Sequence, residues 1–157
     1  SYINYGIENK DEFLELYKQA NKQIESNYKK YLIDDDSFQM IKKMDFGLVK
    51  QKRIENAKII YNYLMNQNKV KYLKNIDFEN DCPIFIPIFL KNEERNNLRK
   101  WLIDKKIYLP IHWPIPKSLK GTKELNIYNE ELSLICDQRY NIENIKDYLK
   151  LLENKVT

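Results

Sequence analysis

Apolar and polar residues alternate with a helical period over the first part of the chain. Between residues 9 and 32 the apolar side chains recur at steps of three and four, which predicts an amphipathic helix of about six turns. The cluster at residues 34–37 (DDDS) ends this helix and offers an N-cap for a short second helix. Asp45 offers a cap for a third helix that runs to about residue 66. We expect no strand before that point.

From residue 67 the pattern changes to short apolar runs that alternate with helical segments. Residues 83–90 are rich in β-branched and aromatic residues but contain prolines, which cannot donate to a ladder, so this run is expected to be an edge strand or to bend at Pro87. The other expected strands lie at residues 70–73, 107–111 and 132–136, and the expected helices at residues 93–105, near 125–130 and from about 141 onwards.

This order of elements predicts an α+β fold. N-terminal helices precede a β-β-α-β-β-α small domain, in which helices cover a small, mostly antiparallel sheet. We divide the chain into a helical lead-in segment, residues 1–66, and an α+β small domain, residues 67–157. The two segments are expected to form one compact unit.

The composition narrows the class of protein. The 157 residues hold 27 Lys and Arg against 23 Asp and Glu, a net charge of +4, and the two signs alternate as they do on solvated helix faces. Nucleic-acid binding usually needs clustered Lys and Arg, so we expect no nucleic-acid partner. The longest apolar run, residues 82–90, is far shorter than the ~18 residues of a membrane span. We therefore expect a cytoplasmic protein without a membrane segment.

The sequence lacks the usual signatures of a self-sufficient catalytic site. Cys82 and Cys136 lie far apart and outside any CxxC pair, which favours reduced thiols over a disulfide or a metal site. The glycine-rich phosphate-binding motifs and the common zinc motifs are missing. No Ser or Cys stands beside a base in the sequence. We expect neither a metal site nor a catalytic residue in this chain.

The only histidine, His112, lies at the end of a predicted strand, beside Trp113 and among three prolines. Prolines fix φ and remove donors, so this segment has few conformations. A rigid aromatic segment that carries one imidazole suits the wall of a ligand pocket, which makes His112 and Trp113 candidate substrate-binding residues. The alternative is a structural histidine that packs beside the tryptophan.

Arg139 is one of only four arginines in a chain that otherwise uses lysine for positive charge. Its presence indicates a need for a planar, bidentate donor, such as one for a carboxylate or a phosphate. The alternative is an internal tie between Arg139 and Asp137 at the start of the last helix. The residues alone leave both interpretations open.

Three stretches of the chain resemble the carboxyl-terminal part of DegT/DnrJ/EryC1/StrS-type aminotransferases. Residues 107–114 (IYLPIHWP) and 132–141 (LSLICDQRYN) carry this resemblance, and residues 44–64 are similar to the helix that leads into the small domain there. The resemblance covers residues 10–155. Members of this family are fold-type-I pyridoxal-phosphate proteins that act mainly on nucleotide-linked sugars.

The resemblance implies that the chain, which begins at Ser1, is the C-terminal small domain of a longer aminotransferase. In that family the Schiff-base lysine and the phosphate-binding loop precede this region, so no lysine here is given that role. His112 and Trp113 are expected to face the substrate cleft. Arg139 lies where fold-type-I enzymes commonly place a carboxylate-binding arginine.

The resemblance also implies a cofactor and partners for the full-length protein. We expect it to be a homodimer that uses pyridoxal phosphate and a sugar-nucleotide substrate. The fragment alone is expected to lack transaminase activity and to bind the cofactor weakly or not at all. Two alternatives are a noncatalytic α+β binding or interaction module, and a degenerate family member that keeps the fold without transamination.

Overall fold

A computed structural model describes residues 10–68, 70–112 and 115–156 of the chain. Contacts divide the chain into two compact units, residues 1–44 and residues 45–157. Trp113, a candidate of the sequence analysis, lies outside the described residues.

The first unit is helical, as the sequence predicts. It contains α1 (Lys10–Asn27), one turn of 3-10 helix η1 (Tyr28–Lys30) and α2 (Asp35–Lys43). Asp34 caps α2, because its carboxylate accepts a hydrogen bond from the backbone N–H of Ser37 at 2.8 Å. No side chain described in this unit is buried. The apolar stripe of α1 therefore has no core of its own among these residues.

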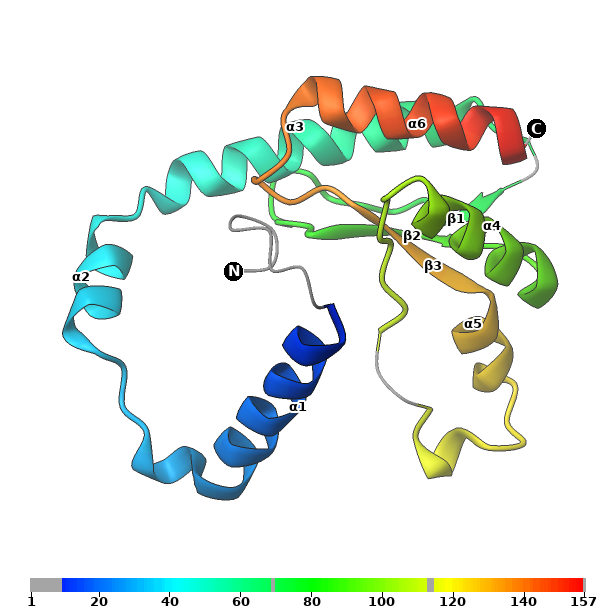
Figure 1. The fold of residues 1–157 in the computed structure, drawn as a ribbon. Coiled ribbons are helices and arrows are strands. Elements are labelled where there is room, and N and C mark those ends of the chain that lie inside the picture. The colour runs from blue at the N-terminus through cyan, green and yellow to red at the C-terminus, as the bar shows by residue number, and fades with distance from the viewer. Residues whose placement is uncertain (1–9, 69, 113–114, 157) are drawn as a thin grey trace. The chain divides into compact units, whose positions relative to one another are not determined.

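The second unit carries the sheet. Its elements are α3 (Phe46–Met65), β1 (Lys71–Tyr72), β2 (Phe85–Phe89), α4 (Asn92–Asp104), η2 (Lys117–Leu119), α5 (Glu124–Glu130), β3 (Glu131–Ile135) and α6 (Ile142–Val156). The predicted α+β class is confirmed. Within this unit α3 and α6 lie side by side across the sheet, and α4 lies next to α5 near the start of β3 (Figure 1).

Helix α3 belongs to the unit that holds the sheet, whereas the sequence analysis divided the chain at residue 66. Asp45 begins this helix as expected, since its carboxylate accepts from the backbone N–H of Leu48 at 2.9 Å. Along α3 the side chains of Ala57, Ile60 and Leu64 are fully or almost fully buried. They contribute to the same core as the strands, so the contacts divide the chain before α3 rather than after it.

The sheet is antiparallel, with the strand order β1-β2-β3. Ile86 lies opposite Leu134 and Ile88 opposite Leu132, so these four side chains share one face, because successive residues of a strand alternate between faces. All four are buried at 2% exposure or less. The core that they join also contains Ile60 and Leu64 from α3 and Ile145, Leu149 and Leu152 from α6.

Strand β2 is the central strand, so the expected edge strand or bend at Pro87 is wrong. The backbone N–H of Cys136 donates to Ile84 and that of Leu90 donates to Glu130, so the even-numbered residues of β2 make the hydrogen bonds to β3. The nitrogen of Pro87 thus faces away from β3. On that side β1 ends at Tyr72, the partner of Ile88, and no ladder bond is lost.

The strand expected at residues 107–111 does not form, although the backbone there is free of helix. Helix α4 ends in a hydrogen-bonded turn in which the N–H of Ile107 donates to Leu102 and that of Lys106 to Ile103, with Lys106 at φ 64°. The carbonyl of Leu109 accepts from the Arg99 side chain, and Pro110 has no N–H to offer. Two of the groups that a ladder needs are therefore used or missing.

The second face of the sheet is mixed in character. Phe85, Pro87 and Phe89 lie opposite Ile135, Ser133 and Glu131 respectively, and all of them alternate along the strands with the buried apolar residues.

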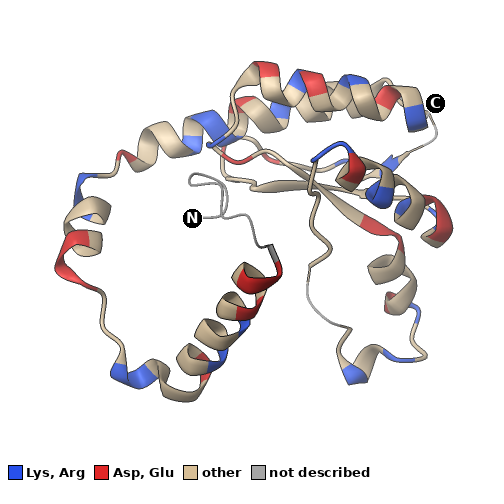
Figure 2. Cartoon of the chain, in the orientation of Figure 1, with Lys and Arg blue, Asp and Glu red and all other residues tan. Residues whose placement is uncertain are grey.

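Charged residues of both signs lie on the helices. Lys and Arg interleave with Asp and Glu along α4 and α6 (Figure 2). Among the described residues no helix is long and apolar enough to cross a membrane.

Candidate functional site

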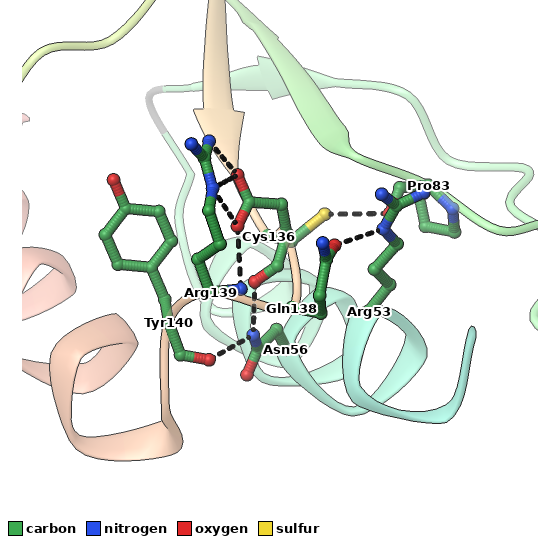
Figure 3. A network of polar contacts seen from close by, with 8 residues as sticks. Arg53, Asn56, Pro83, Cys136, Gln138, Arg139 and Tyr140 are labelled. Carbon is green, nitrogen blue, oxygen red and sulfur yellow. Dashed lines mark hydrogen bonds and ion pairs between the residues drawn. The ribbon is translucent and has the colours of Figure 1, made fainter. Parts of the chain in front are cut away.

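A side chain of α3 holds the loop that follows β3 by hydrogen bonds to its backbone. The Asn56 side chain is 2% exposed, and its Nδ2 group donates to two backbone carbonyls, that of Asp137 at 3.0 Å and that of Tyr140 at 2.9 Å. One amide thus spans the loop from end to end (Figure 3). Because buried carbonyls need partners, Asn56 fixes the path of the backbone that presents Arg139.

Two further contacts tie this loop to its neighbours. Arg53 Nε donates to Gln138 Oε1 at 2.7 Å, and the Cys136 thiol donates to the carbonyl of Pro83 at 3.4 Å (Figure 3). Burial, with a smaller contribution from Asp137, raises the pKa of Cys136 to about 12. The thiol is therefore a structural hydrogen-bond donor rather than a nucleophile. Both cysteines are free.

Asp137 and Arg139 form the internal tie that the sequence left open. Arg139 donates to the carboxylate of Asp137 from Nε at 3.1 Å, from Nη2 at 2.6 Å and from its backbone N–H at 2.9 Å. The Asp137 side chain is 5% exposed and that of Arg139 is 74% exposed. Arg139 therefore has one edge held by a buried carboxylate and the rest open to solvent.

The electrostatics of this pair follow from its burial. Removal from water raises the pKa of Asp137, but hydrogen bonds from Arg139 and the charges of Arg139 and Arg53 outweigh it, and the pKa is lowered overall. The hydrogen bond and charge of Asp137 raise the pKa of Arg139 in turn. The two shifts agree in direction, so both groups are ionised together.

Arg139 borders a cavity of about 460 Å³. Its apolar lining includes Leu109, Ile135 and Leu151. Lys106 and Arg139 supply positive charge to the lining, and Asp147 supplies negative charge. Tyr148 also lines it, and its hydroxyl donates to the carbonyl of Ile135 at 3.2 Å. The pKa of Tyr148 is raised well above its ordinary value, chiefly by burial. The cavity lies between residues 106–109, the end of β3 and α6.

His112 lies on the mixed face of the sheet. Its ring stacks at a tilt on Phe85, with a centroid separation of 4.4 Å and an interplanar angle of 56°. Nε2 lies 3.1 Å from the hydroxyl of Ser133, and that hydroxyl donates to Glu131 Oε1 at 2.5 Å. His112 does not line the cavity beside Arg139. His112 contacts the middle of β3 and Arg139 lies in the loop after its end, so the two candidates do not line the same cavity.

The sequence analysis did not identify every residue that shapes the loop after β3 and the surroundings of His112. It missed Asn56, Glu131 and Ser133. An amide on the apolar side of α3 was a usable signal for Asn56, because a buried polar group in a helix needs a partner. Ser133 had the same signal, a hydroxyl inside an apolar strand. The partners cannot be named from the sequence, because Asn56 and the loop after β3, like His112 and Ser133, lie far apart along the chain.

The described residues do not provide a complete binding site for pyridoxal phosphate. That cofactor needs a lysine to hold its aldehyde, and every lysine whose side chain the structure describes is exposed. The cavity offers cations at its rim but no enclosed amine. The described part of the chain also has no group of three or more His, Cys, Asp or Glu that could hold a metal ion.

The role of Asn56 gives the first prediction. Asn56→Ala leaves two loop carbonyls without their donor, so the free energy of unfolding should fall by about 1–3 kcal/mol. Asn62→Ala, an exposed position on the same helix, should change it by less than about 0.5 kcal/mol. Urea denaturation followed by circular dichroism measures both. Equal effects of the two substitutions would contradict the role of Asn56 in holding the loop after β3.

The lowered pKa of Asp137 gives the second prediction. Below the ordinary value of 3.8 the unfolded state binds a proton at Asp137 that the folded state does not, so stability rises with pH there and is lost as pH falls. Asp137→Asn should lower stability at neutral pH and flatten this part of the curve. Asp147→Asn, a 73% exposed position, is the control. A curve of unchanged slope in Asp137→Asn would refute the assignment.

No protein-family model and no curated protein matches the chain. Solved structures do match it. They include the aminotransferase TlmJ from Streptoalloteichus hindustanus, at 14% identity and a TM-score of 0.54 over 68% of this chain. Spr1654 from Streptococcus pneumoniae, assigned as a sugar aminotransferase, matches in its PMP form at 14% identity and a TM-score of 0.57 over 69% of this chain.

The apo form of Spr1654 matches at 15% identity and a TM-score of 0.54. In each case the match covers 31% of the other protein's length. At such low identity the likeness concerns the fold. The resemblance stated from the sequence is confirmed at that level: the chain has the fold of one part of these aminotransferases.

Proposed function

We propose that this chain is the C-terminal small domain of a pyridoxal-phosphate-dependent aminotransferase that acts on a nucleotide-linked sugar. The observation that carries the proposal is the fold shared with TlmJ and Spr1654 over 68–69% of the chain. The sequence motifs around His112 and Arg139 agree with it, since both lie in the region of the DegT/DnrJ/EryC1/StrS-type resemblance. The substrate class comes from that resemblance.

In this proposal Arg139 binds an anionic group of a substrate, such as the carboxylate of the amino donor. The tie to Asp137 does not prevent this, because Asp137 engages Nε and Nη2 and the side chain stays 74% exposed. Asp137 then orients the guanidinium and leaves its outer edge to the ligand. The adjoining cavity offers apolar side chains, such as Leu109 and Ile135, beside that contact.

His112 and Trp113 would face the substrate cleft of the full-length protein, away from the cavity beside Arg139. The cofactor would be held by the large domain, consistent with the exposure of the described lysines, and supplies the carbanion chemistry when bound. The contribution of this chain is to bind and orient the substrate. We propose a cytoplasmic homodimer without a nucleic-acid partner for the full-length protein.

Two other functions compete with this one. A noncatalytic binding module would use the Tyr-rich surface for a protein partner, and a degenerate relative would keep the fold without the catalytic lysine. The coding sequence upstream of Ser1 separates these from the enzyme. A large domain with a lysine after a serine-containing strand supports the aminotransferase, whereas a start codon directly before Tyr2 favours the module.

Cofactor binding tests the division of roles. The 157-residue chain mixed with pyridoxal phosphate should give no stable aldimine absorbance, because every lysine whose side chain the structure describes is exposed to water. The full-length protein should give that band and should lose it on reduction with borohydride, which fixes the lysine covalently. A stable band with the chain alone would overturn the proposal that this domain lacks the Schiff-base lysine.

Arg139→Lys in the full-length protein tests the binding role. Lysine keeps the charge but loses the planar fork, so the KM for the amino donor should rise roughly tenfold, which corresponds to about 1.4 kcal/mol. The melting temperature should fall only slightly, because lysine keeps the charge beside Asp137 and the backbone N–H of residue 139 still donates to that carboxylate. Lys150→Gln, an exposed position on α6, is the control. A lower melting temperature with an unchanged KM would make Arg139 purely structural.

A further inference from the structure

The contacts of His112 determine which of its two nitrogens is available. Nε2 faces the hydroxyl of Ser133 at 3.1 Å. Nδ1 has no hydrogen-bond partner within the described part of the chain, and the ring contacts Phe85 at a tilt. A neutral imidazole carries its proton on one nitrogen and accepts at the other. The partner of Ser133 therefore decides what His112 can offer to a ligand.

Ser133 has one proton and gives it to Glu131. Its hydroxyl donates to Glu131 Oε1 at 2.5 Å, and an ionised carboxylate can only accept. The Ser133 side chain is 3% exposed, so no bulk water competes for that proton. Toward His112 the same oxygen can then only accept. The contact at Nε2 is possible as a hydrogen bond only when Nε2 carries the proton.

The backbone makes this arrangement rigid. Glu131 and Ser133 are two residues apart on β3, which places them on the same face of the sheet. Phe85 lies opposite Ile135, one step further along that face. Arg95 on α4 is 4% exposed; burial and Arg99 lower its pKa, and the nearby carboxylate of Glu131 opposes that effect. Glu131 thus has a buried cation close to it.

We propose that Glu131 and Ser133 are positioning residues that hold His112 with its proton on Nε2, so that Nδ1 accepts a hydrogen bond from a hydroxyl or amine of a ligand. The ligand part of this inference rests on the proposed function, and the tautomer does not. An acceptor nitrogen favours sugar hydroxyls and disfavours phosphate or carboxylate oxygens, which themselves only accept. His112 and Arg139 therefore recognise different groups of a substrate.

Nitrogen NMR tests the tautomer directly, because this chain contains one histidine. A long-range proton–nitrogen spectrum of the uniformly ¹⁵N-labelled chain, recorded at about pH 8.5 where an ordinary histidine is neutral, distinguishes the two protonated forms. We expect the pattern of a ring protonated at Nε2. The pattern of a ring protonated at Nδ1, or of a rapidly averaged mixture, would overturn the proposal.

Two substitutions test the positioning residues. In Ser133→Ala the acceptor is lost, so the spectrum should move toward a mixture of tautomers. In Glu131→Gln the amide can donate to Ser133, whose hydroxyl can then donate to Nε2, so the spectrum should move toward protonation at Nδ1. Glu130→Gln is the matched control and should leave it unchanged. Wild-type spectra for both Ser133→Ala and Glu131→Gln would refute the positioning role.

The ligand part is tested in the full-length protein with UDP-glucose as a nucleotide-linked sugar, after His112→Gln has identified the signals of His112. We expect the Nδ1 signal to move on titration and the Nε2 signal to stay. Movement of Nε2 alone, or of neither nitrogen, would overturn the acceptor role. Because the tautomer spectrum needs neither ligand nor catalysis, its result is independent of whether the full-length protein is an aminotransferase.

Discussion

The antiparallel pairing of β2 with β3 is the interaction on which the other features of this domain depend. Its register places Ile86 and Ile88 with Leu132 and Leu134 on one face, where all four are buried. A slip of β3 by one residue would turn Leu132 and Leu134 to the opposite face and bury Glu131 and Ser133 in their place. The buried face therefore fixes the opposite face as well, and the position of Ser133 is a consequence of core packing.

The second constraint is the amide of Asn56. It satisfies two carbonyls of the loop after β3 from a position inside the core, and α3 can supply it there because α3 packs against that core. An apolar residue at this position would leave the loop carbonyls without a partner. The orientation of Arg139 therefore depends on the packing of α3, because Asn56 lies more than eighty positions before Tyr140 in the sequence and bonds its carbonyl.

Helices and their caps are local, so the sequence predicted α2, α3 and α6 and the roles of Asp34 and Asp45. Strand order is not local. The prolines of β2 indicated an edge strand. However, β1 is only two residues long and ends before it reaches Pro87, so the missing N–H of Pro87 costs no hydrogen bond to β1. The run at 107–111 has strand-like composition, yet the Arg99 side chain takes the carbonyl of Leu109. The sequence singled out His112 and Arg139, while Ser133 and Asn56 needed the tertiary pairing.

The two proposed recognition points share strand β3. His112 contacts Ser133, and the cavity bordered by Arg139 reaches Ile135, two residues further along the strand. Under the proposed function the guanidinium takes an anionic group of the ligand and Nδ1 takes a hydroxyl donor. A ligand that offers only acceptors would leave the imidazole unpaired, so the two proposed contacts together select a ligand by the placement of its donors.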